Sequence, residues 1–198
     1  MSEPMLRCFL AVDLPDAVRD RLAESVAMLE RELPEVRFSP PENLHVTLKF
    51  LGDFPQDALP RLAHQAAARL ARTPPFDVTL SGVGAFPHGR AARVLWIGVQ
   101  TGAAHLARLA RKLDAAAGKL GASRDRRPFR PHLTLGRLRE PRPIPLDRIE
   151  APDPMTFRVE DVVLYESRLN TSGATHVPLA RLPLGRDPED TTVFAPDF

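Results

Sequence analysis

The chain has 198 residues, a formal net charge of +2, and an ordinary balance of 43% hydrophobic and 26% charged residues. This length and composition suit one globular domain with a substantial core, and they exclude a polycationic nucleic-acid coat. The single cysteine excludes an intrachain disulfide. The apolar start, Met5 to Leu14, is too short to span a bilayer and lacks the architecture of a signal peptide. We therefore expect a cytosolic protein without a membrane partner.

Apolar periodicity predicts elements in the order strand, helix, strand, helix, strand pair, helix, strand, strand pair. The three helices are predicted over residues 15–33, 55–72 and 102–120, each with an apolar stripe at helical spacing. The strands are predicted over 6–14, 36–39, 76–86, 93–100, 157–169 and 176–184, together with two motif strands, one of which ends at Gly52 and the other of which starts at His132. Residues 139–153 are predicted to be a proline-rich connection.

The two motif strands both contain His-x-Thr-Leu, as His45-Val46-Thr47-Leu48 and His132-Leu133-Thr134-Leu135. Successive side chains of a strand point to opposite faces, so each histidine shares a face with its threonine while the apolar residues face the core. Two such pairs, one from each half of the chain, indicate one shared site.

This pattern favours an α+β fold with two similar lobes, each an antiparallel sheet covered by helices on its outer face. The repeat of the motif suggests a pseudo-two-fold duplication, with the active-site cleft between the lobes. We expect residues 1–185 to form this single bilobal domain and residues 186–198 to be a loosely held tail.

Paired histidines suit in-line displacement at phosphorus, because one imidazole can accept a proton while the other donates one. The hydroxyls of Thr47 and Thr134 can donate hydrogen bonds to the non-bridging oxygens. Neither motif carries further ligands at metal-binding spacing, so we expect neither a metal nor another cofactor.

Several segments together resemble the two-histidine phosphoesterases, and within them the bacterial and archaeal RNA 2′,3′-cyclic phosphodiesterases, also known as 2′-5′ RNA ligases. The matching segments are ENLHVTLKFLG, ARVLWIGV, RPFRPHLTLGR and LYESRL followed by Gly173, and the resemblance extends from about Leu6 to Leu184. The resemblance implies metal-free hydrolysis of an RNA 2′,3′-cyclic phosphate end to a 2′-phosphate, and, in reverse, 2′-5′ ligation. It also implies that His45 is the proton donor and His132 the proton acceptor.

Other residues are weaker candidates for substrate binding. Arg130 shares a strand face with His132 and could contact phosphate or a surface carboxylate. Tyr165 could approach the cleft, although a packed role is slightly favoured. His176 stands where relatives often carry an aromatic residue, and strand phase places Phe50 in the core.

The remaining basic residues are assigned to the surface. Arg124, Arg126 and Arg127 are expected to form a solvated basic rim with weak attraction for RNA. His64, His88 and His105 are expected to be surface residues.

Two alternatives to this function stay open. The same site could act on small cyclic nucleotides or 2′-5′ oligonucleotides, or the protein could be a non-catalytic binder of RNA ends. Turnover of a small 2′,3′-cyclic nucleotide separates an enzyme from a binder. We expect a monomer whose partner is RNA ending in a 2′,3′-cyclic phosphate.

Overall fold

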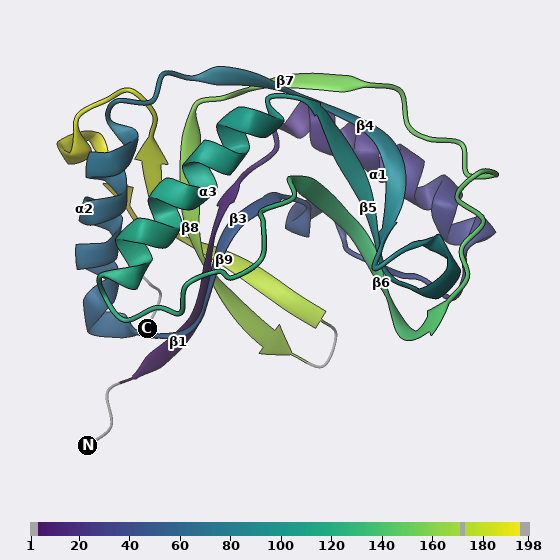
Figure 1. The fold of residues 1–198 in the computed structure, drawn as a ribbon, viewed down its shortest axis with the longest axis horizontal. Coiled ribbons are helices and arrows are strands. Elements are labelled where there is room, and N and C mark those ends of the chain that lie inside the picture. The colour runs from purple at the N-terminus through teal and green to yellow at the C-terminus, as the bar shows by residue number, and fades with distance from the viewer. Residues whose placement is uncertain (1–3, 171–172, 195–198) are drawn as a thin grey trace.

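The structure is a computed structural model that describes residues 4–170 and 173–194. It contains two five-stranded antiparallel sheets (Figure 1), which we call sheet 1, with the order β10-β9-β8-β1-β3, and sheet 2, with the order β2-β6-β5-β4-β7. The strands of sheet 1 are β1 (Met5–Val12), β3 (Val46–Pro55), β8 (Asp161–Asn170), β9 (Gly173–Pro183) and β10 (Thr192–Val193). Those of sheet 2 are β2 (Arg37–Phe38), β4 (Phe76–Phe86), β5 (Ala92–Thr101), β6 (His132–Arg142) and β7 (Met155–Val159).

Three α-helices cover the sheets, as the apolar stripes predicted. Helix α1 (Asp16–Glu32) packs on sheet 2, whereas α2 (Leu59–Leu70) and α3 (Ala103–Gly118) pack side by side on sheet 1 (Figure 1). The buried residues of each helix recur every three or four positions, such as Leu106, Leu109 and Leu113 in α3. The α+β class and the two antiparallel sheets are therefore confirmed. Four short 3₁₀ turns complete the fold: η1 (Pro41–Asn43), η2 (Gln56–Ala58), η3 (Gly89–Ala91) and η4 (Pro188–Asp190).

The strand predicted over 157–169 is in fact two strands in different sheets. Strand β7 ends at Val159 and pairs with β4, whereas β8 starts at Asp161 and pairs with β1 and β9. The burial pattern changes at the same point: residues alternate between buried and exposed in β7, but Val162, Val163 and Leu164 are all buried. An edge strand needs one apolar face, while a strand in the middle of a covered sheet needs two.

Two further segments differ from the sequence-based expectation. Strand β6 continues to Arg142, into the segment predicted to be a connection, because it pairs with β5 as far as Ala92. After Gly185 the chain forms η4 and then β10, which pairs with β9 through Thr192 and Val193. Residues 171–172, between the last two predicted strands, and residues 195–198 lie outside the described residues.

Strand β3 contains two irregularities that change which side chains face the core. Its register with β1 shifts so that Leu48 and Leu51 have no cross-strand partner. Each extra residue moves the alternation of side chains by one position. As a result Lys49 turns toward the core, at 2% exposure, and Phe50 turns to the opposite face, at 60% exposure. The assignment of Phe50 to the core is therefore wrong.

None of the helices in the described part of the chain is both long and apolar enough to cross a membrane.

Candidate active site

The first motif histidine lies where η1 passes into β3, next to the buried Leu44. The Nδ1 atom of His45 donates a hydrogen bond to the Asn43 carbonyl at 2.8 Å, and the Thr47 hydroxyl donates to Nε2 at 2.8 Å. These bonds describe a neutral imidazole with its proton on Nδ1. The Asn43 amide in turn donates to the Ala174 carbonyl at 2.7 Å, which ties this turn to β9.

The pKa of the His45 imidazole is lowered to about 4, mainly because burial disfavours its charged form. The Asn43 carbonyl and Asp13 act in the opposite direction, while the positive potential of His176 and Arg137 lowers the pKa further. His45 is therefore neutral at pH 7 in the protein without substrate.

Aromatic rings surround His45 on sheet 1. Phe9 of β1 stacks on its imidazole with a centroid distance of 4.8 Å, and His176 of β9 approaches edge-on at 5.1 Å. Tyr165 of β8 stacks on the same Phe9 at 5.3 Å, and Phe50 lies 6.1 Å from it. The ring of His45 is thus held in one plane by an aromatic cluster that includes His176.

The second motif histidine, on sheet 2, is held by the same kind of hydrogen bond to a backbone carbonyl. The Nδ1 atom of His132 donates to the Arg130 carbonyl at 2.7 Å, again two residues before the histidine. Burial lowers the pKa of His132, the Arg130 carbonyl raises it, and Arg137 lowers it. Phe86 meets the ring edge-on at 4.9 Å and Trp96 at 6.3 Å.

The indole of Trp96 fits over two glycines on neighbouring strands. A Cβ atom on Gly84 would lie 2.3 Å from the indole, and one on Gly98 would lie 3.3 Å from it. Larger residues at these positions would displace the ring that contacts His132. Gly98 pairs with His132 and Trp96 with Thr134, so this cradle directly underlies the second motif.

The two motif strands, β3 and β6, come together although they belong to different sheets, with Cα atoms within 8 Å of each other. The guanidinium of Arg137 acts electrostatically on both His45 and His132. This arginine was missed by sequence analysis, because strict alternation places it on the core face with Leu133 and Leu135. The register of β6 with β5 shifts between Thr134 and Gly136, and this turns Arg137 to the exposed, histidine face.

The other candidate residues lie around this pair of strands. Tyr165 is partly buried and its hydroxyl donates to Asp13, while burial raises its pKa. Arg130 is exposed, and its carbonyl is the acceptor for His132. The surface assignment of three other histidines is confirmed, since His64, His88 and His105 are exposed.

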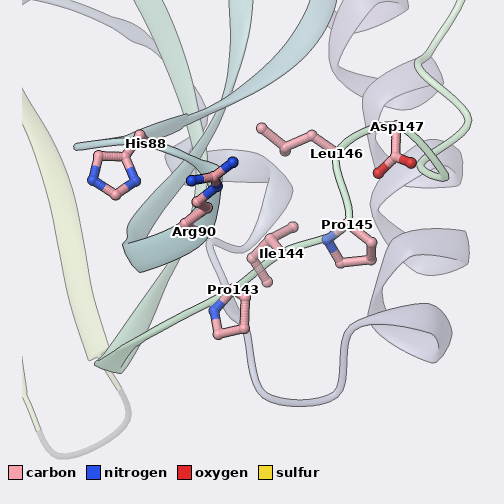
Figure 2. Close-up of a pocket in the computed structure, with 8 residues that line it drawn as sticks. His88, Arg90, Pro143, Ile144, Pro145, Leu146 and Asp147 are labelled. Carbon is pink, nitrogen blue, oxygen red and sulfur yellow. The ribbon is translucent and has the colours of Figure 1, made fainter.

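A metal site and a large surface hollow are two further features on which a site could be built. In residues 4–170 and 173–194 no three His, Cys, Asp or Glu side chains gather as a metal site would require. A hollow of about 870 Å³ lies between η3 and the segment after β6, at the opposite end of β6 from His132 (Figure 2). It is lined by His88, Gly89, Arg90, Pro143, Ile144, Pro145, Leu146 and Asp147 and contains no motif residue.

Comparison with known proteins identifies the family of the chain. Residues 14–171 match the model of the 2′-5′ RNA ligase superfamily. The chain is 34% identical to an RNA 2′,3′-cyclic phosphodiesterase of Methanothermobacter thermautotrophicus, over 88% of this chain and 96% of the relative. It is 32% identical to the RNA 2′,3′-cyclic phosphodiesterase of Escherichia coli, over 91% of this chain and 97% of the relative.

Solved structures show the same fold. Escherichia coli LigT complexed with 3′-AMP matches with a TM-score of 0.75 and 29% identity, over 91% of this chain and 98% of that one. The Thermus thermophilus protein TT0787 matches with a TM-score of 0.74 and 34% identity, over 91% and 98%. On the extent of these matches, the chain belongs to the 2′-5′ RNA ligase superfamily, in the family of the RNA 2′,3′-cyclic phosphodiesterases.

Proposed function

We propose that this protein is an RNA 2′,3′-cyclic phosphodiesterase in which His45 and His132 act as the acid and base at one phosphate. The observation that carries the proposal is the matched tethering of the two imidazoles. Each Nδ1 is bound to the carbonyl two residues earlier, so each Nε2 is the atom left for proton transfer. The relatives named RNA 2′,3′-cyclic phosphodiesterase supply the substrate class.

The reaction requires one proton to be removed and one to be supplied. His132 Nε2 takes a proton from water as the water oxygen attacks phosphorus. The bond between phosphorus and the 3′ oxygen then breaks, and His45 Nε2 donates a proton to that oxygen. The products are a 2′-phosphate and a 3′-hydroxyl. If an RNA 5′-hydroxyl attacks in place of water, the same steps join it to the phosphorus and give a 2′-5′ linkage.

The phosphate oxygens need donors as charge develops in the transition state. Thr47 and Thr134 lie on the same faces as the two histidines and supply hydroxyl donors. The Thr47 hydroxyl donates to His45 Nε2 in the free protein, and it becomes available to phosphate when that nitrogen is protonated. Arg137 adds a guanidinium near both imidazoles, and Arg130 adds a second one at the start of β6. Tyr165 stacks on Phe9, and Phe9 in turn stacks on His45. Tyr165 therefore contributes to the substrate side of sheet 1 through the ring of Phe9.

The acid role of His45 depends on substrate, because its pKa of about 4 leaves it neutral at pH 7 in the free protein. A cyclic phosphate carries a negative charge, and an opposite charge within a few ångströms favours the protonated imidazole. Binding of the substrate therefore raises the pKa of His45, so that Nε2 takes a proton from solvent and can donate it to the departing oxygen.

The same site could serve smaller substrates. Escherichia coli LigT binds 3′-AMP, which favours small 2′,3′-cyclic nucleotides as a second candidate substrate class. We further propose that the protein works as a cytosolic monomer without metal or cofactor.

The decisive experiment offers the purified protein an RNA oligomer with a 2′,3′-cyclic phosphate end after exhaustive treatment with EDTA. We expect full hydrolysis, and product analysis that gives 2′-phosphate and no 3′-phosphate. A 3′-phosphate product would reverse the assigned leaving group, and loss of activity restored by a divalent ion would refute the metal-free scheme. Binding without turnover would favour the RNA-end-binding alternative.

A further inference from the structure

Lys49 is the one buried charged residue in the part of the chain that the structure describes, at 2% exposure. Its ammonium group contacts Asp114 of α3 at 2.8 Å and Asp125 at 3.0 Å, and it donates to the Ser123 carbonyl at 2.7 Å. Three acceptors match the three N–H donors of the group. Lys49 follows Thr47 by two residues, and the irregularity at Leu48 turns it to the core side of β3, so this cluster lies behind the first motif.

The partners of Lys49 belong to the segment 123–131, which we call the arginine loop, and to the helix before it. The loop lies between α3, which ends at Gly118, and β6, which starts at His132 (Figure 1). Its first part is fixed to Asp114, which accepts from the Asp125 amide at 3.1 Å and pairs with Arg124 at 3.3 Å. Its last part is fixed by the hydrogen bond between His132 and the Arg130 carbonyl.

Between these two fixed ends the loop presents arginines to solvent. Arg126, Arg127 and Arg130 are exposed, and their side chains form no ion pair or hydrogen bond with any residue that the structure describes. The acidic residues near them, Asp114 and Asp125, are balanced by Lys49 together with Arg124, which pairs with Asp114. The outward charge of the loop is therefore positive.

A buried lysine is costly, because its ammonium group must be taken out of water. Lys49 carries that cost to hold a loop in which one apolar residue, Phe129, packs partly buried against the core. These contacts hold the backbone of the loop, which carries Arg126, Arg127 and Arg130 in the six residues before His132. The guanidinium group of arginine can donate two parallel hydrogen bonds to phosphate oxygens. RNA of any sequence carries these negatively charged phosphates along its backbone.

We infer that the arginine loop binds the phosphodiester backbone of RNA upstream of the cyclic phosphate, and that Lys49 positions the loop for this role. The inference rests on the proposed function. It deepens that function by assigning the enzyme to RNA oligomers rather than to mononucleotides. The catalytic residues remain His45 and His132, and the arginine loop takes no part in the chemical step.

The loop also sets how long the favoured RNA must be. Arg130 is two residues before His132, whereas Arg126 is six residues before it, so the arginines extend at most about 20 Å from the histidine. Contacts over that distance cover only a few nucleotides. Turnover should therefore rise over the first few added nucleotides and then level off.

The test compares Arg126→Gln/Arg127→Gln with the unmodified protein on a nucleoside 2′,3′-cyclic phosphate and on an RNA hexamer with the same terminus. We expect unchanged kcat/KM on the mononucleotide and a fall of roughly 2- to 30-fold on the hexamer, the sum expected of two exposed charge contacts. The plot of log kcat/KM against log salt should become shallower by about 1.4 for the hexamer only. Arg21→Gln/Arg31→Gln on α1 removes the same charge elsewhere and should change neither substrate.

Several outcomes would overturn the inference. They are an unchanged hexamer rate, an equal loss on both substrates, or an equal loss in the α1 control, which would indicate an effect of overall charge. If the unmodified protein hydrolyses neither substrate, the proposed function itself fails. If it hydrolyses both with the same salt slope, only the arginine-loop inference fails.

The positioning role of Lys49 is tested with Lys49→Met, which keeps the length of the side chain. A folded variant, checked by thermal melting, should lose the preference for the hexamer and keep mononucleotide turnover. A folded variant that keeps the preference would remove Lys49 from the role. If the variant does not fold, the arginine pair still decides whether the loop binds RNA.

Discussion

At the scale of single residues, the two motif histidines are oriented in the same way on different sheets. Each Nδ1 donates to the carbonyl two residues before it, and each imidazole has aromatic rings against it. Backbone carbonyls cannot be lost by substitution, so the tautomer of each ring is fixed by the chain itself. This leaves Nε2 as the reactive nitrogen in both motifs.

Replacing either histidine should remove most of the chemical step. We expect His45→Ala and His132→Ala each to lower kcat by about 10²–10⁴-fold, the usual contribution of a general acid or base. The fold-loss in kcat of the double variant should be smaller than the product of the two single fold-losses, because the pair acts as a unit. Thr47→Ala and Thr134→Ala should keep measurable activity, with part of their loss in KM.

Steady-state kinetics on all five variants makes this measurement, with His64→Ala on α2 as the matched control. Thermal melts check that each variant is folded. A folded His45→Ala or His132→Ala protein with near-normal turnover would remove that histidine from the mechanism.

The pH dependence should report the lowered pKa values of both histidines. In the free protein His45 has a pKa of about 4 and that of His132 lies below 6.5. Hydrolysis needs His45 protonated and His132 neutral, so kcat/KM, which reports the free enzyme, should peak between pH 4 and 6.5. The peak of kcat should lie at higher pH, because bound anionic phosphate raises the pKa of His45. Coinciding peaks above pH 7 would contradict these assignments.

Stability must be followed in the same buffers. The folded-state pKa of His45 lies below the unfolded value of 6.5, so its stabilising contribution is complete above pH 6.5 and is lost as the pH falls toward about 4. Asp114 also has a lowered pKa: burial raises it, but Lys49 and the Asp125 amide lower it by more. Its contribution is lost only at still lower pH. Circular dichroism at each pH therefore separates loss of catalysis from unfolding.

At the scale of elements, strand irregularities decide which residues reach the site. The sequence predicted the three helices, both motifs and the faces of His45, Thr47, His132 and Thr134, because apolar periodicity specifies these directly. It did not predict Phe50, Lys49 or Arg137, since extra residues in β3 and β6 reverse the alternation after each motif. For Arg137 the signal was present, as a charged residue at a position that strict alternation would bury.

The division of the predicted strand 157–169 has a similar cause. No turn residue separates β7 from β8, so local signals gave one strand. The change from alternating to continuous burial was the available indication.

The glycine cradle of Trp96 gives an element-scale prediction. Gly84→Ala places a Cβ atom 2.3 Å from the indole, so the ring must move. We expect destabilisation of about 1–3 kcal/mol, typical of overpacking, and a lower kcat because the ring that contacts His132 is displaced. Trp96 is the only tryptophan, so its fluorescence reports the movement.

The cause can be isolated with a double-mutant cycle. Trp96→Phe removes the indole atoms that meet the new Cβ, so adding Gly84→Ala to that variant should cost much less stability. Equal costs in both backgrounds, measured by thermal unfolding, would show that the indole is not what the methyl group meets.

At the scale of the whole molecule, the chain passes repeatedly between the two sheets. It enters sheet 1 with β1, sheet 2 with β2, sheet 1 with β3 and sheet 2 with β4, and it returns to sheet 1 with β8. Helix α3 packs on sheet 1 although it connects two strands of sheet 2. Local patterns predicted two lobes, but not this interleaving, because strand pairing depends on contacts between distant segments.

Interleaving predicts that the two lobes unfold together. Neither sheet can be completed from one continuous half of the chain, so loss of either sheet removes packing from the other, as in a cooperative single domain.

The chain offers one probe in each sheet: Trp96 lies in β5 of sheet 2, and Tyr165, the only tyrosine, lies in β8 of sheet 1. Labelling with 5-fluorotryptophan and 3-fluorotyrosine allows ¹⁹F NMR to follow both in one urea titration. We expect the two native resonances to disappear with the same midpoint and slope, because both report the same transition. Gly84→Ala in sheet 2 should shift both midpoints equally, and two separate midpoints would mean that the lobes are independent folding units.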